Sequence, residues 1–269
     1  MPELRPKEVS VDSQRKLARF FGKVSRAASR FLLLDYDGTL APFHVNRRRA
    51  IPYPGLVDLL ERIRTRTNTH LAIVSGRPSK EVSALIGLRH VEIWGDQGLE
   101  RFRADGRHEL VKVDEQIVQR ISEARTLLRK EGLADLLENK YAALAIHWRG
   151  LESIDGELKG RVDKVWSLLS SRRGLRLMEF DHGVEIRAAT RNKGDVVRSV
   201  LAEAGAGAAI AYLGDDRTDE DAFAALQGFG LGILVHQNNR PTVADVWIRP
   251  PDGVRMFLSA WLASCEDAK

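Results

Sequence analysis

The stretch FLLLDYDGTLAP, residues 31–42, decides the fold of this chain. Its first residues are apolar and predict a buried β-strand. Asp35 and Asp37 follow directly, so we expect both carboxylates at the strand's carboxyl end, where open α/β sheets bind their ligands. Two neighbouring carboxylates repel each other unless a cation or a shared proton compensates for their charge. The stretch therefore predicts a ligand site, and an ordinary turn after a strand is the alternative.

Short apolar runs alternate with longer amphipathic segments on both sides of this stretch. Such alternation is typical of βαβ units and predicts an α/β fold with a Rossmann-like parallel-sheet core and helices on both faces. Strands are expected at residues 31–34, 70–74, 91–94, 209–213 and 230–235. Helices are expected at residues 54–65, 78–86, 193–204, 219–226 and 254–262.

The alternation of short apolar runs and amphipathic segments stops in the middle of the chain. The different pattern there predicts an inserted α+β cap domain. Apolar and polar residues alternate over residues 99–113, around the hairpin signal Asp105-Gly106. Further strands are expected at residues 142–148, 175–180 and 184–187, and further helices at residues 117–128 and 157–169. The expected domains are a catalytic core at residues 30–107 and 189–269, a cap at residues 108–188, and an N-terminal segment, residues 1–29, that either packs on the core as a helix or is mobile.

A second acidic motif, GDDRTDED at residues 214–221, follows the apolar strand expected at residues 209–213. So many carboxylates are costly to hold together without a cation, and hard oxygen ligands of this kind favour Mg²⁺. The start of a helix is the alternative, because acidic residues suit a cap and a first helical turn. We expect both, with Asp215 and Asp216 at the metal and the later acidic residues at the helix start.

Two further segments predict contacts with an anion. Ser75-Gly76-Arg77 lies between an expected strand and a helix that begins near Pro78, so its N–H groups and the helix dipole suit a phosphate. Lys193, in Asn192-Lys193-Gly194, stands at a helix start, where a cation is unfavourable unless a phosphate or carboxylate compensates. A plain turn and an exposed lysine are the alternatives for the two segments.

In chain order, these four motifs resemble those of the haloacid dehalogenase-like phosphatases. Within that superfamily, residues 35–42 and 212–223 resemble the trehalose-6-phosphate phosphatases. Three segments of the insert resemble the cap of the same group, at residues 138–140, 145–149 and 183–187. The resemblance covers roughly residues 30–262.

Two positions depart from the pattern of that group. The chain has Asp96-Gln97-Gly98 where the group usually has Asn-His-Gly, and it has Trp148 where the group usually has tyrosine after the cap histidine. The first departure bears on which sugar phosphate is the substrate.

The resemblance implies a phosphatase that works through an aspartyl-phosphate intermediate, with Mg²⁺ as its cofactor. Asp35 would be the nucleophile, and Asp37 would be the acid for the leaving oxygen and then the base for water. The implied metal-binding residues are Asp35, Asp37 through its backbone carbonyl, Asp215 and Asp216. Asp215 would be the direct ligand of the last motif, whereas Asp216 and Asp219 would act through water or position the loop. The implied substrate-binding residues are Thr39, Ser75, Gly76, Arg77, Lys193, Glu138, Lys140 and Glu185, of which Ser75 and Lys193 would hold phosphoryl oxygens and the last three the sugar.

The resemblance thus implies hydrolysis of trehalose 6-phosphate to trehalose and phosphate, with functional pairing to a trehalose-6-phosphate synthase. The alternatives with the same chemistry are phosphatases of sucrose phosphate, mannosyl-3-phosphoglycerate or glucosyl-3-phosphoglycerate, and a phosphomutase. A non-catalytic sugar-phosphate sensor is the alternative from another class. An intact Asp35 and Asp37 argue against the sensor, because a pure binder needs neither.

Composition limits the remaining classes. The net charge is +5 at pH 7, but only residues 47–49 form a tight basic run, so we expect no nucleic-acid partner. No apolar run approaches the roughly 18 residues of a membrane helix, and the first residues lack the apolar region of a secretory signal. One cysteine excludes an internal disulfide, which fits a cytoplasmic protein.

Overall fold

The computed structural model describes residues 11–148, 150–169, 173–180 and 182–266. Residues 1–10 of the N-terminal segment, Arg149 of the segment 145–149, and Asp181 lie outside the described residues. The chain divides into two compact units, one formed by residues up to Glu109 and from Asn192 onwards, and the other by Leu110–Arg191. We describe each unit by itself.

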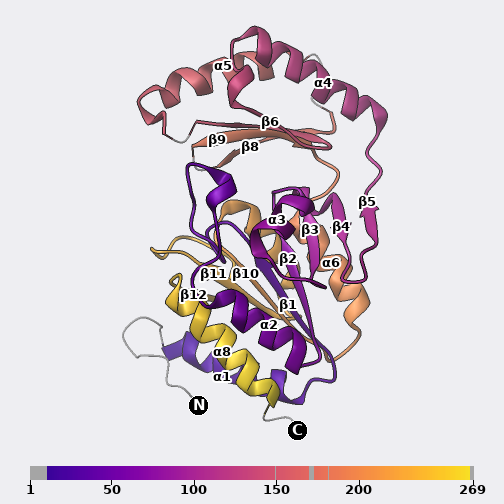
Figure 1. Cartoon of the computed structure of the whole chain (residues 1–269), viewed down its shortest axis with the longest axis vertical. Helices are drawn as coiled ribbons and strands as arrows, with labels where there is room; N and C mark the ends of the chain where they lie inside the picture. The colour runs from indigo at the N-terminus through magenta and orange to yellow at the C-terminus, as the bar shows by residue number, and fades with distance from the viewer. Residues whose placement is uncertain (1–10, 149, 170–172, 181, 267–269) are drawn as a thin grey trace. The chain divides into compact units, whose positions relative to one another are not determined.

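The larger unit is built on a mainly parallel sheet. Its described strands are β1 (Arg30–Asp35), β2 (Thr69–Val74), β3 (Glu92–Gly95), β4 (Glu100–Phe102), β5 (His108–Leu110), β10 (Ala209–Gly214), β11 (Leu231–Val235) and β12 (Val246–Ile248). The strand order is β12-β11-β10-β1-β2-β3-β4-β5 (Figure 1). The strands from β12 to β3 pair in parallel, and β4 pairs with β3 in the antiparallel sense. The expected parallel core is therefore confirmed.

Helices cover both faces of this sheet, as the alternating apolar runs predict. The described helices of the unit are α1 (Val11–Arg26), α2 (Leu56–Arg66), α3 (Ser79–Ile86), α6 (Lys193–Ala204), α7 (Glu220–Leu226) and α8 (Asp252–Glu266). Leu32 and Leu34 pack in one apolar cluster with α1, α2, α3 and α8, whereas Leu33 packs in a second cluster with α6 and α7. Successive strand residues point to opposite faces, so a continuous apolar run is what a sheet covered on both sides requires.

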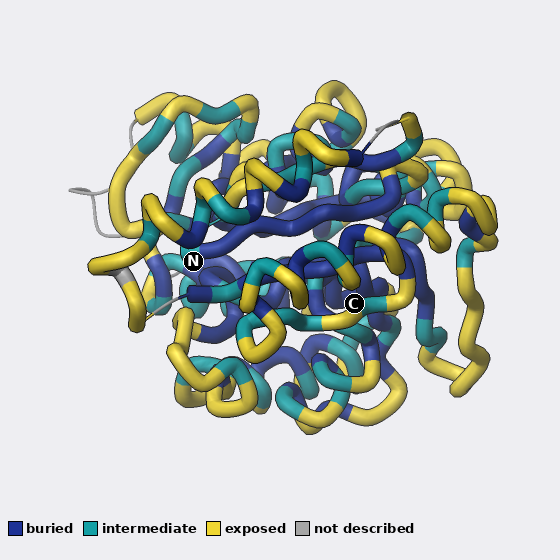
Figure 2. The backbone as a smooth tube through the Cα atoms, turned by 90° about the horizontal axis from the view of Figure 1, so that it is seen from above, coloured by how far each residue is buried: buried dark blue, intermediate teal, exposed yellow. Residues whose placement is uncertain are grey.

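Each covering helix is amphipathic. In α2 the buried residues are Leu56, Leu59, Leu60 and Ile63, which recur at helical spacing along one side. Figure 2 shows this pattern as helical turns that change between buried and exposed, next to strands that are buried along most of their length.

The described part of the N-terminal segment forms α1 and packs on the larger unit. The Phe20 ring lies 6.0 Å from the Trp261 ring, and the Phe21 ring lies 5.3 Å from the Phe257 ring, both on α8. Burying one such aromatic side chain contributes about 1.5–3 kcal/mol. Of the two interpretations of this segment, packing as a helix is the one that residues 11–26 adopt.

The turn at Asp105 and Gly106 joins β4 to β5, and β5 lies at the edge of the larger sheet. The alternating pattern predicts the hairpin, but it does not reveal which sheet the hairpin joins. Pairing with β3, such as Ile93 opposite Phe102, decides that question.

The smaller unit has a four-stranded antiparallel sheet in the order β6-β7-β9-β8. Its described elements are α4 (Glu115–Lys130), β6 (Leu137–Asn139), β7 (Ala143–His147), α5 (Asp155–Leu168), β8 (Leu175–Phe180) and β9 (Gly183–Ala188). Glu138 on β6 stands opposite Ala145 on β7, which stands opposite Glu185 on β9. Residues directly opposite each other share a face of the sheet, so both glutamates lie on the same face.

Candidate active site

Three loops of the candidate site leave adjacent parallel strands at the same edge of the sheet. In the strand register, Asp35 stands opposite Val74, and Leu34 stands opposite Leu213. Ser75 therefore follows β2 directly beside the end of β1, and Asp215 follows β10 on the other side of β1. Parallel pairing alone brings these motifs together, although they are far apart in the sequence.

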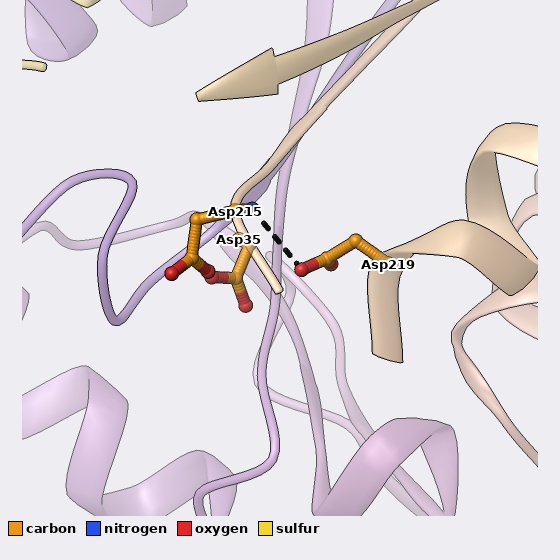
Figure 3. Close-up of side chains that lie close together, drawn as sticks. All are labelled: Asp35, Asp215 and Asp219. Atoms are coloured by element: carbon orange, nitrogen blue, oxygen red, sulfur yellow. Dashed lines mark hydrogen bonds between the residues drawn. The ribbon is translucent and has the colours of Figure 1, made fainter. Parts of the chain in front are cut away.

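A cluster of three aspartates forms at this edge. One carboxylate oxygen from each of Asp35, Asp215 and Asp219 lies within 4.8 Å of the others. All three residues are at least nine-tenths buried. In Figure 3 the carboxylates of Asp35 and Asp215 lie side by side, and Asp219 approaches from the start of α7. Asp219 Oδ2 accepts hydrogen bonds from the N–H groups of Asp215 and Asp216, at 3.1 and 3.0 Å, which fixes the loop between them.

Lys193 is the cation of this cluster and is itself only 3% exposed. Its Nζ donates to Asp35 Oδ1 at 2.6 Å and to Asp219 Oδ1 at 2.7 Å. The Tyr212 hydroxyl also donates to Asp219 Oδ1, at 2.6 Å. A lysine in the first turn of α6 is unfavourable because of the helix dipole, and the two carboxylates offset this cost. Such an arrangement is expected at a site that binds an anion or a metal.

The cluster of Asp35, Asp215, Asp219 and Lys193 holds more negative than positive charge. Burial raises the pKa of Asp35 from 3.8 to about 7, with Asp219 and Asp37 adding to the rise and Lys193 opposing it. Burial, then Asp35 and Asp219, raises the pKa of Asp215 well above its ordinary value. Burial acts to lower the pKa of Lys193, but the two neighbouring carboxylates outweigh it and raise that pKa. One lysine among three carboxylates leaves net negative charge in a buried site.

These residues fit a divalent metal. Carboxylate oxygens are the donors that hard cations prefer, and the cluster gathers three of them where water is largely excluded. A bound cation would relieve the repulsion that raises the pKa values of Asp35 and Asp215. The cluster could therefore hold a metal ion, with Asp35, Asp215 and Asp219 supplying side-chain oxygens.

Asp216, which the sequence places at the metal, has a different position. Its Oδ1 accepts from the N–H of Arg217 at 2.6 Å, and with Asp219 it forms a reciprocal capping box at the helical turn Arg217–Asp219. The structure thus brings Asp35 and Asp215 together with Asp219, and the Asp216 carboxylate is outside this group. The spacing of the motif was a usable signal for Asp219, because a residue four positions after Asp215 returns to it through one helical turn.

Gly38 allows the close approach of the two acidic loops. Its φ is +81°, which L-residues rarely adopt, and a Cβ at this position would overlap the carboxylate of Asp215. The glycine of the first motif is therefore required by the packing of Asp215 against the loop that carries Asp35.

Asp37 points to Arg77 and is outside the three-aspartate cluster. Arg77 Nε donates to Asp37 Oδ2 and Nη2 donates to Asp37 Oδ1, each at 2.6 Å. Arg77 Nη1 donates to the carbonyl of Arg47 at 2.9 Å and to Glu81. Burial acts to lower the pKa of Arg77, but Asp37 and Glu81 outweigh it and raise that pKa. The sequence predicts that Arg77 binds substrate. In the structure, its guanidinium donates to two carboxylates and a backbone carbonyl.

The predicted anion pocket is a tight backbone structure. Ser75 is buried, and its hydroxyl accepts from the N–H of Arg77 at 3.1 Å. The N–H groups of Asp96 and Gln97 donate to the carbonyls of Arg77 and Ser75, at 2.9 Å each. Asp96 and Gln97 have φ values of 47° and 60°, which cost of order 1 kcal/mol each for residues other than glycine. The departure Asp96-Gln97-Gly98 thus lies directly on the pocket loop.

The Gln97 side chain lies over Gly76, since a Cβ on that glycine would meet Gln97 Nε2. Thr39 is fully buried, and its hydroxyl has no hydrogen-bond partner among the residues that the structure describes. Thr39 and Ser75 follow neighbouring strands, which leaves Thr39 Oγ1 available for a ligand oxygen.

The expected sugar-binding residues meet within the smaller unit. Lys140 Nζ lies 2.5 Å from Glu185 Oε2 and 4.0 Å from Glu138 Oε1. His147 Nε2 lies 2.7 Å from Glu138 Oε2, a pairing that sequence analysis did not predict. Burial acts to raise the pKa of Glu185, but Lys140 outweighs it and lowers that pKa. The group is a polar network on one face of the four-stranded sheet, in which the Lys140 and Glu185 side chains are buried, Glu138 is half-buried and the His147 side chain is 41% exposed.

The family model described as trehalose-phosphatase matches residues 33–246. Among curated relatives, the probable trehalose-phosphate phosphatase 9 of Oryza sativa subsp. japonica is 32% identical, over 88% of this chain and 70% of that protein. The trehalose-6-phosphate phosphatase of Escherichia coli K12 is 28% identical, over 79% of this chain and 82% of that protein. The bifunctional trehalose-6-phosphate synthase/phosphatase of Thermoproteus tenax is 29% identical, over 93% of this chain and 33% of that protein.

Solved structures share the fold. The C-terminal domain of Candida albicans trehalose-6-phosphate phosphatase superposes with a TM-score of 0.76 at 19% identity, covering 93% of this chain and 96% of that one. A haloacid dehalogenase-like hydrolase from Bacillus subtilis gives a TM-score of 0.56 at 14% identity, covering 86% and 99%. Within the described residues, no helix combines the length and the apolar character needed to cross a bilayer.

Proposed function

Because the chain belongs to the trehalose-phosphatase family, we propose that it hydrolyses trehalose 6-phosphate to trehalose and inorganic phosphate with Asp35 as the nucleophile. The observation that carries the proposal is the place of Asp35, buried at the carboxyl end of β1 with Asp215, Asp219 and Lys193 around it. The reaction is the cleavage of a phosphoric monoester. The family favours trehalose 6-phosphate over sucrose phosphate and the glycosylated phosphoglycerates as the substrate.

In the first step, a carboxylate oxygen of Asp35 attacks phosphorus, and the bond between phosphorus and the sugar oxygen breaks. Asp37 gives a proton to that oxygen, so that trehalose leaves as a neutral alcohol. The raised pKa of Asp35 means that the metal-free site tends to hold a proton on the nucleophile. A bound Mg²⁺ supplies positive charge that favours the ionised nucleophile and reduces its repulsion from the phosphate.

In the second step, the Asp37 carboxylate takes a proton from water, whose oxygen attacks phosphorus. The bond between phosphorus and Asp35 breaks, and inorganic phosphate is released. Ser75, Gly76, Thr39 and Lys193 bind the phosphoryl oxygens, by hydroxyl, backbone N–H and ammonium groups. These donors suit the charge that phosphoryl transfer spreads over the non-bridging oxygens.

The smaller unit serves as a cap domain and supplies groups for the sugar. Glu138, Lys140 and Glu185 present acceptors and a donor from one face of the four-stranded sheet, which suits a ligand rich in hydroxyl groups. Lys140 and Glu185 already pair with each other, so the network is ordered before a sugar binds.

A panel assay of the purified chain tests the proposal. We expect phosphate release from trehalose 6-phosphate to exceed release from sucrose phosphate and glucosyl-3-phosphoglycerate by at least about 100-fold in kcat/KM, the size that several discriminating hydrogen bonds supply. Asp35→Asn is expected to retain the fold and lose turnover. Normal turnover by that variant, or equal rates across the panel, would refute the assignment.

The substrate must come from an enzyme that makes trehalose 6-phosphate, so the chain pairs functionally with a trehalose-6-phosphate synthase. The fusion of both activities named for the Thermoproteus tenax relative supports this pairing. The single cysteine, Cys265, is buried and forms no internal disulfide, which supports a cytoplasmic location.

A further inference from the structure

The Arg77 guanidinium lies beside Asp37, the proposed proton donor, and is held by several hydrogen bonds. Each of its three guanidinium nitrogens donates to an oxygen: Nε and Nη2 to the two oxygens of Asp37, and Nη1 to Glu81 and the Arg47 carbonyl. The Arg77 side chain is 7% exposed, and the Asp37 side chain is 25% exposed. The guanidinium is therefore buried with four of its five N–H donors engaged, while the carboxylate that it holds stays accessible.

The anchors of Arg77 come from three separate segments. Glu81 lies in the first turn of α3, and it also binds the Arg47 guanidinium with both oxygens at 3.1 Å. The Arg77 backbone is fixed as well, because its N–H donates to Ser75 Oγ and its carbonyl accepts from the Asp96 N–H. A side chain fixed at both ends has little freedom, so Arg77 and Asp37 keep one relative orientation.

A carboxylate has about four lone-pair positions, and a bidentate arginine occupies two of them. The remaining lone pairs of Asp37 lie in the plane that Arg77 fixes. Asp37 can then exchange a proton through a free lone pair without breaking its ion pair with Arg77. The guanidinium sets the direction in which that lone pair points.

We propose that Arg77, held by Glu81 and the Arg47 carbonyl, is a positioning residue that aims the Asp37 carboxylate at the leaving-group oxygen. The inference rests on the proposed function of Asp37 as proton donor. Any contribution of Arg77 to substrate binding is then mainly indirect, since four of its five N–H donors are already engaged by carboxylates and a carbonyl.

The dependence of rate on the leaving group tests this role. The alcohol of trehalose 6-phosphate needs a proton to leave, whereas the nitrophenolate of p-nitrophenyl phosphate leaves without one. The burst of nitrophenolate after rapid mixing with the Mg²⁺-loaded enzyme reports the first step alone. Trehalose release in a single turnover reports the same step with the poor leaving group.

We expect Arg77→Gln to slow trehalose release about 10- to 100-fold, part of the 10²–10⁴-fold that general acids supply. The rate of the nitrophenolate burst should stay within about threefold of the wild type, because this leaving group needs no general acid. The KM for trehalose 6-phosphate should also stay within about threefold, because a positioning residue for the acid acts on the chemical step. Arg48→Gln is the matched control: it removes the same charge from the neighbouring loop, at an exposed residue. It should change neither rate.

Glu81→Gln keeps Arg77 and Asp37 in place and weakens only the anchor, so it serves if Arg77→Gln does not fold. It should show the same selective loss, smaller in size. Equal loss on both substrates, or no selective loss in Glu81→Gln, would overturn the proposal. Weaker binding of orthovanadate by more than about tenfold in Arg77→Gln would also overturn it, because that result places Arg77 on the phosphate.

Asp37→Asn separates this inference from the proposed function. If Asp37→Asn slows both substrates equally, the acid role itself is wrong. If Asp37→Asn is selective and a folded Arg77→Gln is not, the acid role stands and only the positioning role is wrong.

Discussion

The charge imbalance around Asp35 predicts that a variant without activity is more stable than the wild type. Asp35→Asn removes one of three buried carboxylates, leaves Lys193 paired with Asp219, and nearly preserves side-chain volume. In metal-free protein we expect this variant to unfold at a higher temperature than the wild type at pH 8.

The magnitude follows from the pKa of Asp35. The native state raises this pKa from 3.8 to about 7. Each pKa unit corresponds to about 1.4 kcal/mol, so ionised Asp35 lowers native stability by about 4 kcal/mol. This figure already includes the opposing effect of Lys193, and asparagine replaces a neutral carboxyl imperfectly, so the expected gain is about 2–4 kcal/mol. For a chain of this size, that is a rise of roughly 4–7 °C in Tm.

The size of the stability gain depends on pH. Native Asp35 binds its proton more tightly than the unfolded chain does, so wild-type stability falls as pH rises from about 4 to about 7. The advantage of Asp35→Asn should therefore appear across that range, stay constant above it, and vanish below pH 4. Mg²⁺ should reverse the order, because a bound ion stabilises the wild type more than the variant.

Thermal melts in EDTA at pH 4, 6 and 8, repeated with Mg²⁺, measure these effects. Asp58→Asn, at an exposed residue in the first turn of α2, is the control and should change Tm by little. A variant no more stable than the wild type at pH 8 in EDTA would refute the claim that the cluster is short of positive charge.

Three further outcomes are expected. Chelation by EDTA should abolish phosphate release and added Mg²⁺ should restore it; full activity in EDTA would contradict a metal at Asp35. Gly38→Ala should reduce activity by at least about 100-fold in a folded protein, because its Cβ displaces Asp215 and the backbone is strained; near-normal rates would show that the two loops can separate. Lys140→Met should lower stability by about 3 kcal/mol, because Glu185 is left buried without its nearest cation, and the loss should shrink as pH falls below 4.5 and Glu185 takes up a proton; melts at pH 4 and 7 measure both.

The local pattern of the sequence determined most of the elements and the identity of the central loops. The apolar run before Asp35 needs burial on both faces, so a parallel sheet and a ligand edge follow from it. The short strands β6 and β12 escaped prediction, because three residues carry too little periodicity to be recognised. The packing of α1 was also open, since only the rings of α8 show which way its apolar side turns.

Only the tertiary structure decided which side chains of each motif meet. The motif did not distinguish Asp216 from Asp219, but the turn Arg217–Asp219 carries Asp219 back to Asp35 and leaves Asp216 as its cap. The sequence predicts that Arg77 binds substrate, and only the structure reveals its contact with Asp37, 40 residues earlier. A motif fixes the chemical groups, whereas their direction depends on torsion angles set by long-range packing, which no local pattern encodes.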